Sequence, residues 1–77
     1  MKTEKQLWIY PNPSDGYITF SKSSDLIEIF DITSKKIMRF KNTFKNQELD
    51  ISKLNSGYYI IKISDDEEVN NKKLIVR

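Results

Sequence analysis

Clusters of turn-forming residues interrupt this sequence about every ten positions. The clusters read PNPSDG, SKSSD, TSKK, KNTFKN, LNSG and SDDEEVNNK. Gly reaches positive φ, Pro fixes φ, and Asn, Asp and Ser hydrogen-bond nearby backbone, so each cluster favours a turn. No segment between them sustains the i, i+3, i+4, i+7 spacing of an amphipathic helix. The spacing therefore predicts a succession of short strands joined by turns.

The apolar runs between these clusters alternate with a period of two, as half-buried strands do. The residues predicted to face inward are Ile18 and Phe20, Ile27 and Ile29, Leu49 and Ile51, Tyr59, Ile61 and Ile63, and Leu74 and Val76. The chain has eleven isoleucines and nine aromatic residues but no alanine. That composition suits a pleated, half-buried surface better than a helix.

The pattern predicts strands near residues 6–10, 17–21, 26–31, 36–41, 47–52, 57–64 and 71–76. Short strands at this spacing favour an all-β fold, specifically a small immunoglobulin-like antiparallel β-sandwich of about seven strands. A small open barrel is the alternative architecture. With 77 residues, we expect one domain over residues 1–77, of which residues 1–5 are a poorly ordered linker.

Composition excludes several classes of function. The chain has no cysteine and no histidine, which removes disulfides, thiol catalysis, the commonest metal ligand and the Ser–His triad. Its 13 basic and 11 acidic residues are scattered along the chain, so we expect no nucleic-acid partner. No run approaches the roughly 20 apolar residues of a membrane span, so we expect no membrane insertion. The apolar run LWIY after MKTEKQ is too short for the core of a signal peptide, so a secretion leader would belong to a longer protein.

Both prolines lie in one short stretch, YPNPSDG, at residues 10–16. Pro11 and Pro13 donate no backbone hydrogen bond, so neither fits a central strand. Asn12 precedes a proline and can hydrogen-bond the backbone two residues further on, as turn residues do. Gly16 supplies a positive φ. We therefore expect the first strand to end here and the chain to reverse into the second.

Residues able to carry chemistry are few, and we expect no catalytic residue, no cofactor and no enzyme activity. The one dense carboxylate cluster is DDEE at residues 65–68, which is typical of a solvated hairpin tip. Weak calcium binding there is the alternative, because oxygen-rich loops suit calcium. Exposed aromatic residues leave open a carbohydrate-binding or adhesive module of a secreted enzyme. The candidates for such a platform are Trp8, Tyr10, Tyr17, Phe40, Phe44 and Tyr58.

Four blocks cover most of the chain and, in their order and spacing, resemble one family. They are YPNPSDG, IEIFDITSKKI, LNSGYYIIKI and KKLIVR. Together they resemble the type A C-terminal sorting domain of the type IX (Por) secretion system, found in secreted proteins of Bacteroidetes. The motif residues are Pro11, Asn12, Pro13, Gly16, Asp31, Lys35, Leu54, Gly57 and Tyr59. Ser34 stands where the family's D-x-x-G-K turn has glycine, so it either adopts the glycine conformation or the turn differs.

The resemblance implies a domain at the end of a larger cargo protein, which it directs across the outer membrane. The implied partners are the outer-membrane translocon, its shuttle and its sortase-like protease. The implied destination is the cell surface or the medium, reached through the periplasm. The family's signal is concentrated toward the C-terminus, so the sorting-signal candidates are Lys72, Lys73, Leu74, Ile75, Val76 and Arg77. As structure alone they form an ordinary closing strand. Our hypothesis is that a receptor reads such a strand at a sheet edge by strand addition or by docking of its alternate side chains.

Overall fold

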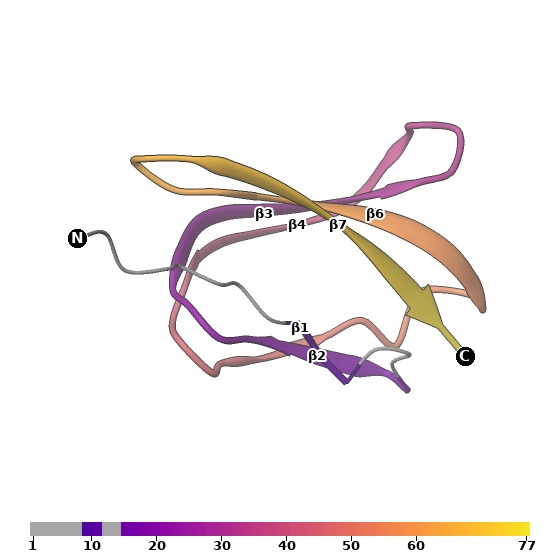
Figure 1. Cartoon of the computed structure of the whole chain (residues 1–77). Helices are drawn as coiled ribbons and strands as arrows, with labels where there is room; N and C mark the ends of the chain where they lie inside the picture. The colour runs from indigo at the N-terminus through magenta and orange to yellow at the C-terminus, as the bar shows by residue number, and fades with distance from the viewer. Residues whose placement is uncertain (1–8, 12–14) are drawn as a thin grey trace.

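The computed structural model describes residues 9–11 and 15–77, and throughout these residues the chain is all-β. Its strands are β1 (Ile9–Tyr10), β2 (Tyr17–Phe20), β3 (Ser24–Asp31), β4 (Lys36–Thr43), β5 (Glu48–Asp50), β6 (Gly57–Ser64) and β7 (Val69–Val76). They form two antiparallel sheets, ordered β1-β2-β5 and β4-β3-β6-β7, which lie as stacked layers in Figure 1. The predicted all-β fold with strands in two antiparallel sheets is confirmed. The arrangement is consistent with an immunoglobulin-like sandwich.

The strand boundaries follow the predicted ones closely. β6 has the predicted bounds, and β3, β4 and β7 each extend two residues further at one end. Most of the added residues are polar, such as Ser24, which pairs with Thr43. An available partner strand continues the backbone ladder whatever the propensity of the side chain. β2 and β5 are shorter than predicted. Residues 6–8 of the predicted first strand lie outside the described residues.

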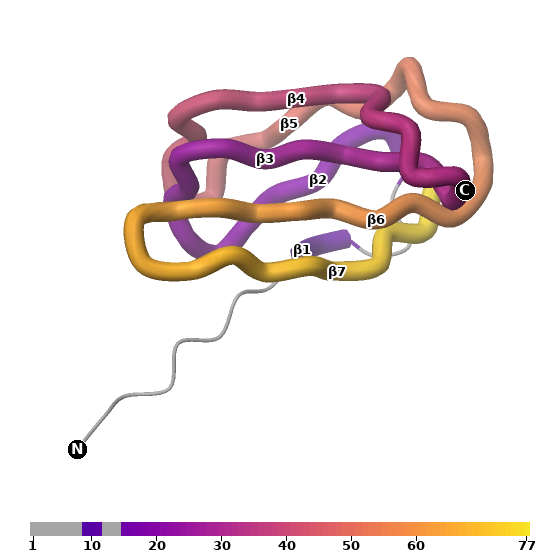
Figure 2. The backbone as a smooth tube through the Cα atoms, turned by 90° about the horizontal axis from the view of Figure 1, so that it is seen from above, coloured from indigo at the N-terminus to yellow at the C-terminus, as the bar shows by residue number. Residues whose placement is uncertain are grey.

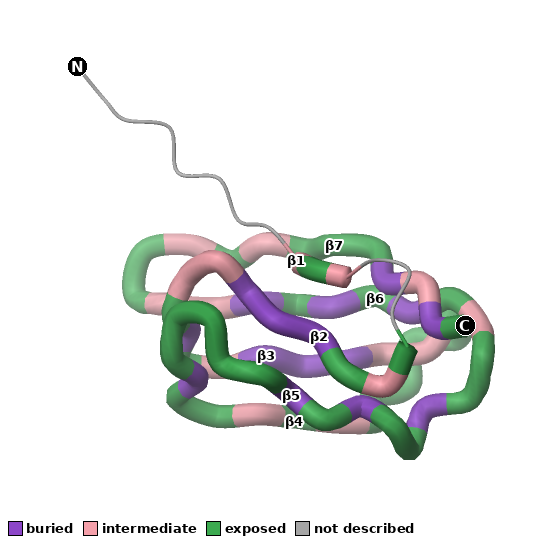
Figure 3. Tube along the Cα trace, turned by 90° about the horizontal axis from the view of Figure 1, so that it is seen from below, coloured by how far each residue is buried: buried purple, intermediate pink, exposed green. Residues whose placement is uncertain are grey.

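Inward-facing residues of both sheets form one hydrophobic core. The buried apolar side chains are Ile18, Phe20, Ile27, Ile29, Leu49, Ile51, Leu54, Tyr59, Ile61, Ile63, Leu74 and Val76. Every residue predicted to face inward belongs to this cluster, and Figure 3 shows buried segments on strands of both sheets. Ile9, Met38 and Phe40 pack against its margin while remaining partly exposed. The period-two pattern therefore identified the core correctly.

Thr19 and Glu28, which alternation places opposite the core residues of their strands, are nevertheless buried, as are Ser24 and Thr43 at the end of the β3–β4 ladder. Thr19 is 7% exposed because β2 is the middle strand of its sheet, where Tyr10 and Glu48 flank Thr19 on both sides. Glu28 is 8% exposed and lies in β3, also an inner strand. Period-two alternation predicts that the side chains of Thr19 and Glu28 are exposed. It does not distinguish inner strands, whose two neighbours cover such side chains, from edge strands.

The sheet order makes β7 an edge strand. β3 and β6 are the inner strands of the four-stranded sheet, with β4 and β7 at its two edges. Figure 2, which looks down on this sheet, shows β7 running along its border opposite β4. Within the described part of the chain there is no helix of the length and apolarity needed to cross a membrane.

Candidate functional site

The terminal segment, residues 72–77, lies in and just beyond β7. Leu74 and Val76 point into the core and are 0% and 6% exposed. Lys72, Lys73 and Arg77 are exposed. The segment thus inserts two apolar side chains into the core and presents three cations to solvent.

The motif residues of β6 lie directly opposite this segment. In the β6–β7 ladder, Gly57 pairs with Val76 and Tyr59 pairs with Leu74. The ring of Tyr59 is mostly buried, and its hydroxyl donates a 2.7 Å hydrogen bond to the backbone carbonyl of Asn55. Tyr59 therefore ties the loop before β6 to the strand that holds the terminal segment.

Asp31 continues the same row across the sheet, since it pairs with Tyr59 from the β3 side. Its Oδ1 accepts hydrogen bonds from the Thr33 hydroxyl at 2.6 Å, the Thr33 N–H at 2.8 Å and the Lys35 N–H at 3.0 Å. These bonds, led by that of the Thr33 hydroxyl, lower the pKa of Asp31 below its ordinary 3.8. Backbone bonds close the turn, from the Asp31 N–H to the Lys35 carbonyl at 2.9 Å and from the Ser34 N–H to the Asp31 carbonyl at 3.0 Å.

Ser34 adopts the conformation expected of the glycine it replaces, with φ +73°. Asp31 holds the turn through hydrogen bonds from the N–H groups of Thr33 and Lys35, on either side of Ser34. Ser34 therefore lies in the left-handed region that glycine reaches at low cost.

Gly16 and Leu54 fix the end of the β2–β5 pair and the loop that follows β5. Gly16, at φ +115°, accepts a 2.9 Å hydrogen bond through its carbonyl from the N–H of Ile51. The carbonyl of Ile51 accepts in turn from the N–H of Leu54 at 3.0 Å, and the Leu54 side chain is buried. Pro11 is partly buried just after β1, while Asn12 and Pro13 lie outside the described residues.

The described motif residues therefore gather at one end of the sandwich. The β3–β4 turn, the start of β6 and the end of β7 all lie at the same end in Figures 1 and 2. Sequence reasoning identified these residues as separate blocks and did not predict that Asp31 and Tyr59 form one row with Leu74 of the terminal segment. The pairing order β3-β6-β7 is the information that was missing.

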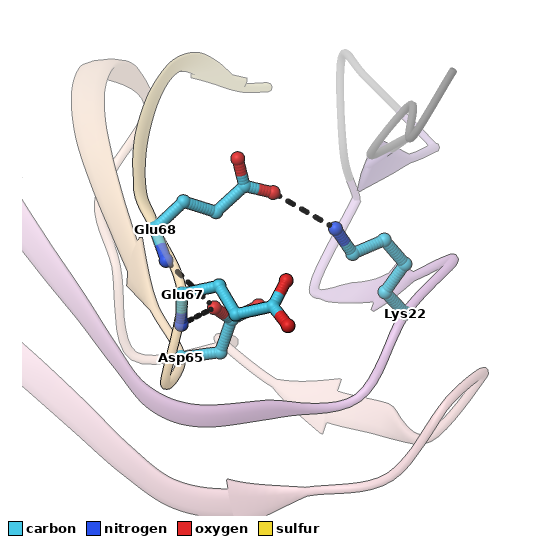
Figure 4. Close-up of polar contacts among 4 residues, drawn as sticks. All are labelled: Lys22, Asp65, Glu67 and Glu68. Atoms are coloured by element: carbon cyan, nitrogen blue, oxygen red, sulfur yellow. Dashed lines mark hydrogen bonds and ion pairs between the residues drawn. The ribbon is translucent and has the colours of Figure 1, made fainter. Parts of the chain in front are cut away.

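The acidic run lies at the opposite end, in the hairpin between β6 and β7. Asp65 Oδ1 accepts hydrogen bonds from the N–H groups of Glu67 at 2.9 Å and Glu68 at 3.0 Å, as Figure 4 shows. Glu68 reaches across to Lys22, with its Oε2 3.3 Å from the lysine Nζ. Among the described residues, no three or more acidic side chains are grouped so as to hold a metal ion. Asp65 and Glu68 thus organise the hairpin and its contact with residue 22.

Asp25 adds a further carboxylate at this end. Repulsion from the neighbouring Asp66 raises the pKa of Asp25 above its ordinary 3.8, and partial desolvation acts in the same direction. Both side chains line an open hollow of ≈ 460 Å³, together with Asp65 and Glu67. This clustering of like charges is unfavourable to the fold at neutral pH.

The aromatic residues proposed as a sugar platform are divided among several elements. Tyr17 lies in β2 and Tyr58 in β6, which belong to different sheets, while Phe44 follows β4 in a loop. Tyr10 donates a 2.6 Å hydrogen bond to Asn46 Oδ1. Phe40 packs partly against the core, and Trp8 lies outside the described residues. The aromatics on the described elements are therefore not arranged along one strand face.

These features define a class of protein, a small β-sandwich module in which turns and motif residues hold an edge strand in place. The family model for the secretion system C-terminal sorting domain matches residues 8–77, and the chain belongs to this family. The resemblance drawn from the four sequence blocks is confirmed. A comparison with curated proteins gives no match.

The family membership establishes the function of the chain. It is a C-terminal secretion signal of the type IX system, a signal that this system recognises as part of a larger cargo, and this interpretation is supported over the carbohydrate-binding alternative. A sorting domain is not itself catalytic, whatever the activity of its cargo. Its role implies delivery of the cargo to the cell surface or the medium.

Proposed function

We propose that residues 72–77 are the part of this sorting domain that the outer-membrane translocon reads. The observation that carries the proposal is that β7 is an edge strand whose neighbour in the sheet order is β6 alone. An edge strand offers backbone groups and alternate side chains to an incoming strand. Exposed Lys72, Lys73 and Arg77 add charge-dependent recognition to that geometry.

The motif residues serve this segment by holding it in place. Gly57 and Tyr59 pair with Val76 and Leu74, and Asp31 fixes the turn at the same end. A preformed strand reduces the ordering cost of binding, which favours recognition of the folded domain. In this proposal the translocon, its shuttle and a sortase-like protease act in turn, and the cargo passes through the periplasm and outer membrane.

Deleting residues 72–77 tests the proposal only in part. The deletion removes Leu74 and Val76 from the core, so it would unfold the domain as well as remove the signal. The sharper variant is Lys73→Glu/Arg77→Glu, which changes two exposed charges and leaves the core intact.

The assay uses a reporter with a secretion leader, fused ahead of the full chain and expressed in a bacterium that has a type IX system. We expect Lys73→Glu/Arg77→Glu to leave the reporter in the periplasm while the unfolding temperature of the purified chain stays unchanged. Lys45→Glu/Lys53→Glu, which makes the same charge change at exposed loop positions, is the control and is expected to be exported. Normal export of the Lys73/Arg77 variant would refute the placement of the signal.

A further inference from the structure

The outer face of the four-stranded sheet, which points away from the β1-β2-β5 sheet, is strongly cationic. Strand register places five basic side chains on it, with Glu28 as the acidic one; these are Lys36, Arg39, Lys41, Lys62 and Lys73. Five positive charges less one negative charge give +4 on this face, whereas the whole chain carries +2. Positive charge is therefore concentrated here and not spread evenly.

Glu28 lies among these cations and forms an ion pair with one of them, Lys36. Lys36 Nζ lies 2.9 Å from Glu28 Oε2. Arg39 on β4 and Lys62 on β6 flank Glu28 in the ladder. The Lys36 hydrogen bond is the main cause of the lowered pKa of Glu28, and the charges of Lys62 and Arg39 add to it. Glu28 thus supplies one negative charge against the three positive charges of Lys36, Arg39 and Lys62, and the face keeps a net positive charge.

Next to these cations the same face carries exposed apolar surface. Phe30 pairs with Ile60, and both line an open hollow of ≈ 340 Å³ with Ile32. Ile32 is 77% exposed and Ile60 is 40% exposed, while Tyr58, two residues before Ile60 on β6, is 63% exposed. The hollow has apolar walls at Phe30, Ile32 and Ile60 and polar walls at Asp31, Ser34 and Asn71. Exposed apolar walls beside a cluster of cations differ from an ordinary solvated sheet face.

We propose that this face, comprising Lys36, Arg39, Lys62 and the Phe30–Ile60 hollow, docks an acidic protein surface that inserts an apolar side chain into the hollow. The inference rests on the proposed function, because the partner acts during export. The outer face would be a second contact surface, in addition to the terminal segment at residues 72–77. Charge complementarity requires an anionic partner. The hollow favours a protein, because an inserted side chain fills a concavity, whereas a flat bilayer surface meets protruding apolar groups.

The test uses the reporter fusion with the neutralising variant Arg39→Gln/Lys62→Gln. Glutamine is chosen because glutamate at either position would oppose Glu28 within the sheet. We expect export of the reporter to fall by about tenfold, with the reporter accumulating in the periplasm, because charged contacts guide and stabilise docking. Lys45→Gln/Lys53→Gln removes the same charge from exposed loop positions and is expected to be exported normally.

A second pair of variants tests the hollow. Ile60→Gln places a polar amide in it, while Val69→Gln makes the same kind of change at an exposed position of β7 that does not line it. We expect Ile60→Gln to reduce export and Val69→Gln to leave it unchanged. The unfolding temperature of each purified chain shows whether the fold survives.

The remaining outcomes overturn the proposal. If the reporter fused to Arg39→Gln/Lys62→Gln is exported at the control level, the outer face is not a docking surface. The terminal-segment proposal still stands in that case, provided that export of the Lys73→Glu/Arg77→Glu fusion is blocked. Charge-dependent co-sedimentation of the wild-type chain with phosphatidylglycerol vesicles would identify a lipid surface as the occupant. A dimer that Arg39→Gln/Lys62→Gln dissociates would identify a second copy of this chain.

Discussion

The Oδ1 atom of Asp31 accepts a 3.0 Å hydrogen bond from the N–H of Lys35, four residues further along the chain. With its bonds to Thr33, this contact makes one carboxylate the organiser of the entire β3–β4 turn. The same residue pairs with Tyr59, which pairs with Leu74 of the terminal strand. The turn and the terminal strand are therefore two ends of a single row of residues.

Replacing Asp31 by asparagine is expected to destabilise the domain at neutral pH. The amide oxygen can accept hydrogen bonds but lacks the negative charge that strengthens them. Urea unfolding should give a lower midpoint with an unchanged slope, since the surface exposed on unfolding stays the same. Asp15→Asn, at an exposed position before β2, is the control and is expected to unfold at the wild-type midpoint.

The Asp31 effect should also depend on pH. The pKa of Asp31 is lowered in the folded state, so its contribution is fully present above the ordinary value of 3.8. It is lost as the pH falls through the lower folded value, where the carboxylate takes up a proton. The difference between wild type and Asp31→Asn should therefore shrink below pH 3.8. A difference that stays constant across this range would contradict the assigned role.

Ser34→Gly is expected to stabilise the domain. A left-handed conformation costs a residue with a side chain about 1–2 kcal/mol, while glycine adds about 0.5–1 kcal/mol of unfolded-state entropy. The first effect is larger, so we expect a net gain of about 0.5–1 kcal/mol, measured by urea unfolding. Ser56→Gly is the control, because Ser56 is not among the positive-φ residues and should gain nothing. Equal effects at the two positions would show that the φ of Ser34 carries no strain.

Period-two alternation predicted the strands and the core because burial depends mainly on which face of a strand a residue occupies. Ile27, Ile29 and Ile61 were assigned inward by this rule alone, and all three are fully buried. The rule gave the wrong exposure for Thr19 and Glu28, since both lie on inner strands whose neighbours cover them. Strand order depends on long-range pairing, which local sequence does not encode.

The candidate site was predictable in its residues but not in its geometry. Asp31, Gly57 and Tyr59 were identified because they match a family pattern, and only the register places them beside Leu74 and Val76. The basic outer face was missed for the same reason. Lys36, Arg39 and Lys62 are scattered in sequence and surround Glu28 only after β3, β4 and β6 have paired.

Tyr59→Phe is expected to cost about 1 kcal/mol, the usual net value of one hydrogen bond. The change keeps the buried ring and removes the hydroxyl that donates to the carbonyl of Asn55. Tyr58→Phe makes the same chemical change at the neighbouring position, which is 63% exposed, and is expected to have little effect. Urea unfolding of the two variants provides the comparison. If both lose the same stability, the Asn55 contact is not the cause.

Asp25→Asn is expected to stabilise the domain at neutral pH, whereas Asp31→Asn is expected to destabilise it. Repulsion from Asp66 raises the pKa of Asp25, so the folded state is penalised while both carboxylates are charged. The penalty is fully present above the raised folded value and disappears as the pH falls to the ordinary 3.8. The gain in unfolding temperature should therefore vanish in acid. A gain that persists below pH 3.8 would point to a cause other than charge.

Gly57→Ala is expected to destabilise the domain, and the terminal strand in particular. A methyl group here would meet no atom within 4 Å, so the effect is one of backbone conformation and not of crowding. Gly57 has φ +151°, a region whose cost for other residues is about 1–3 kcal/mol, against at most about 1 kcal/mol gained by restricting the unfolded chain. We expect a net loss of about 1–2 kcal/mol by urea unfolding.

Because Gly57 pairs with Val76, the loss in Gly57→Ala should appear as faster hydrogen exchange of amides near the end of β7. Amides near the start of β7, around Val69, pair at the other end of β6 and provide the internal comparison. If the strand is what the translocon reads, export of the reporter should fall in parallel with protection of β7. Loss of protection with unchanged export would separate the stability of the strand from its recognition.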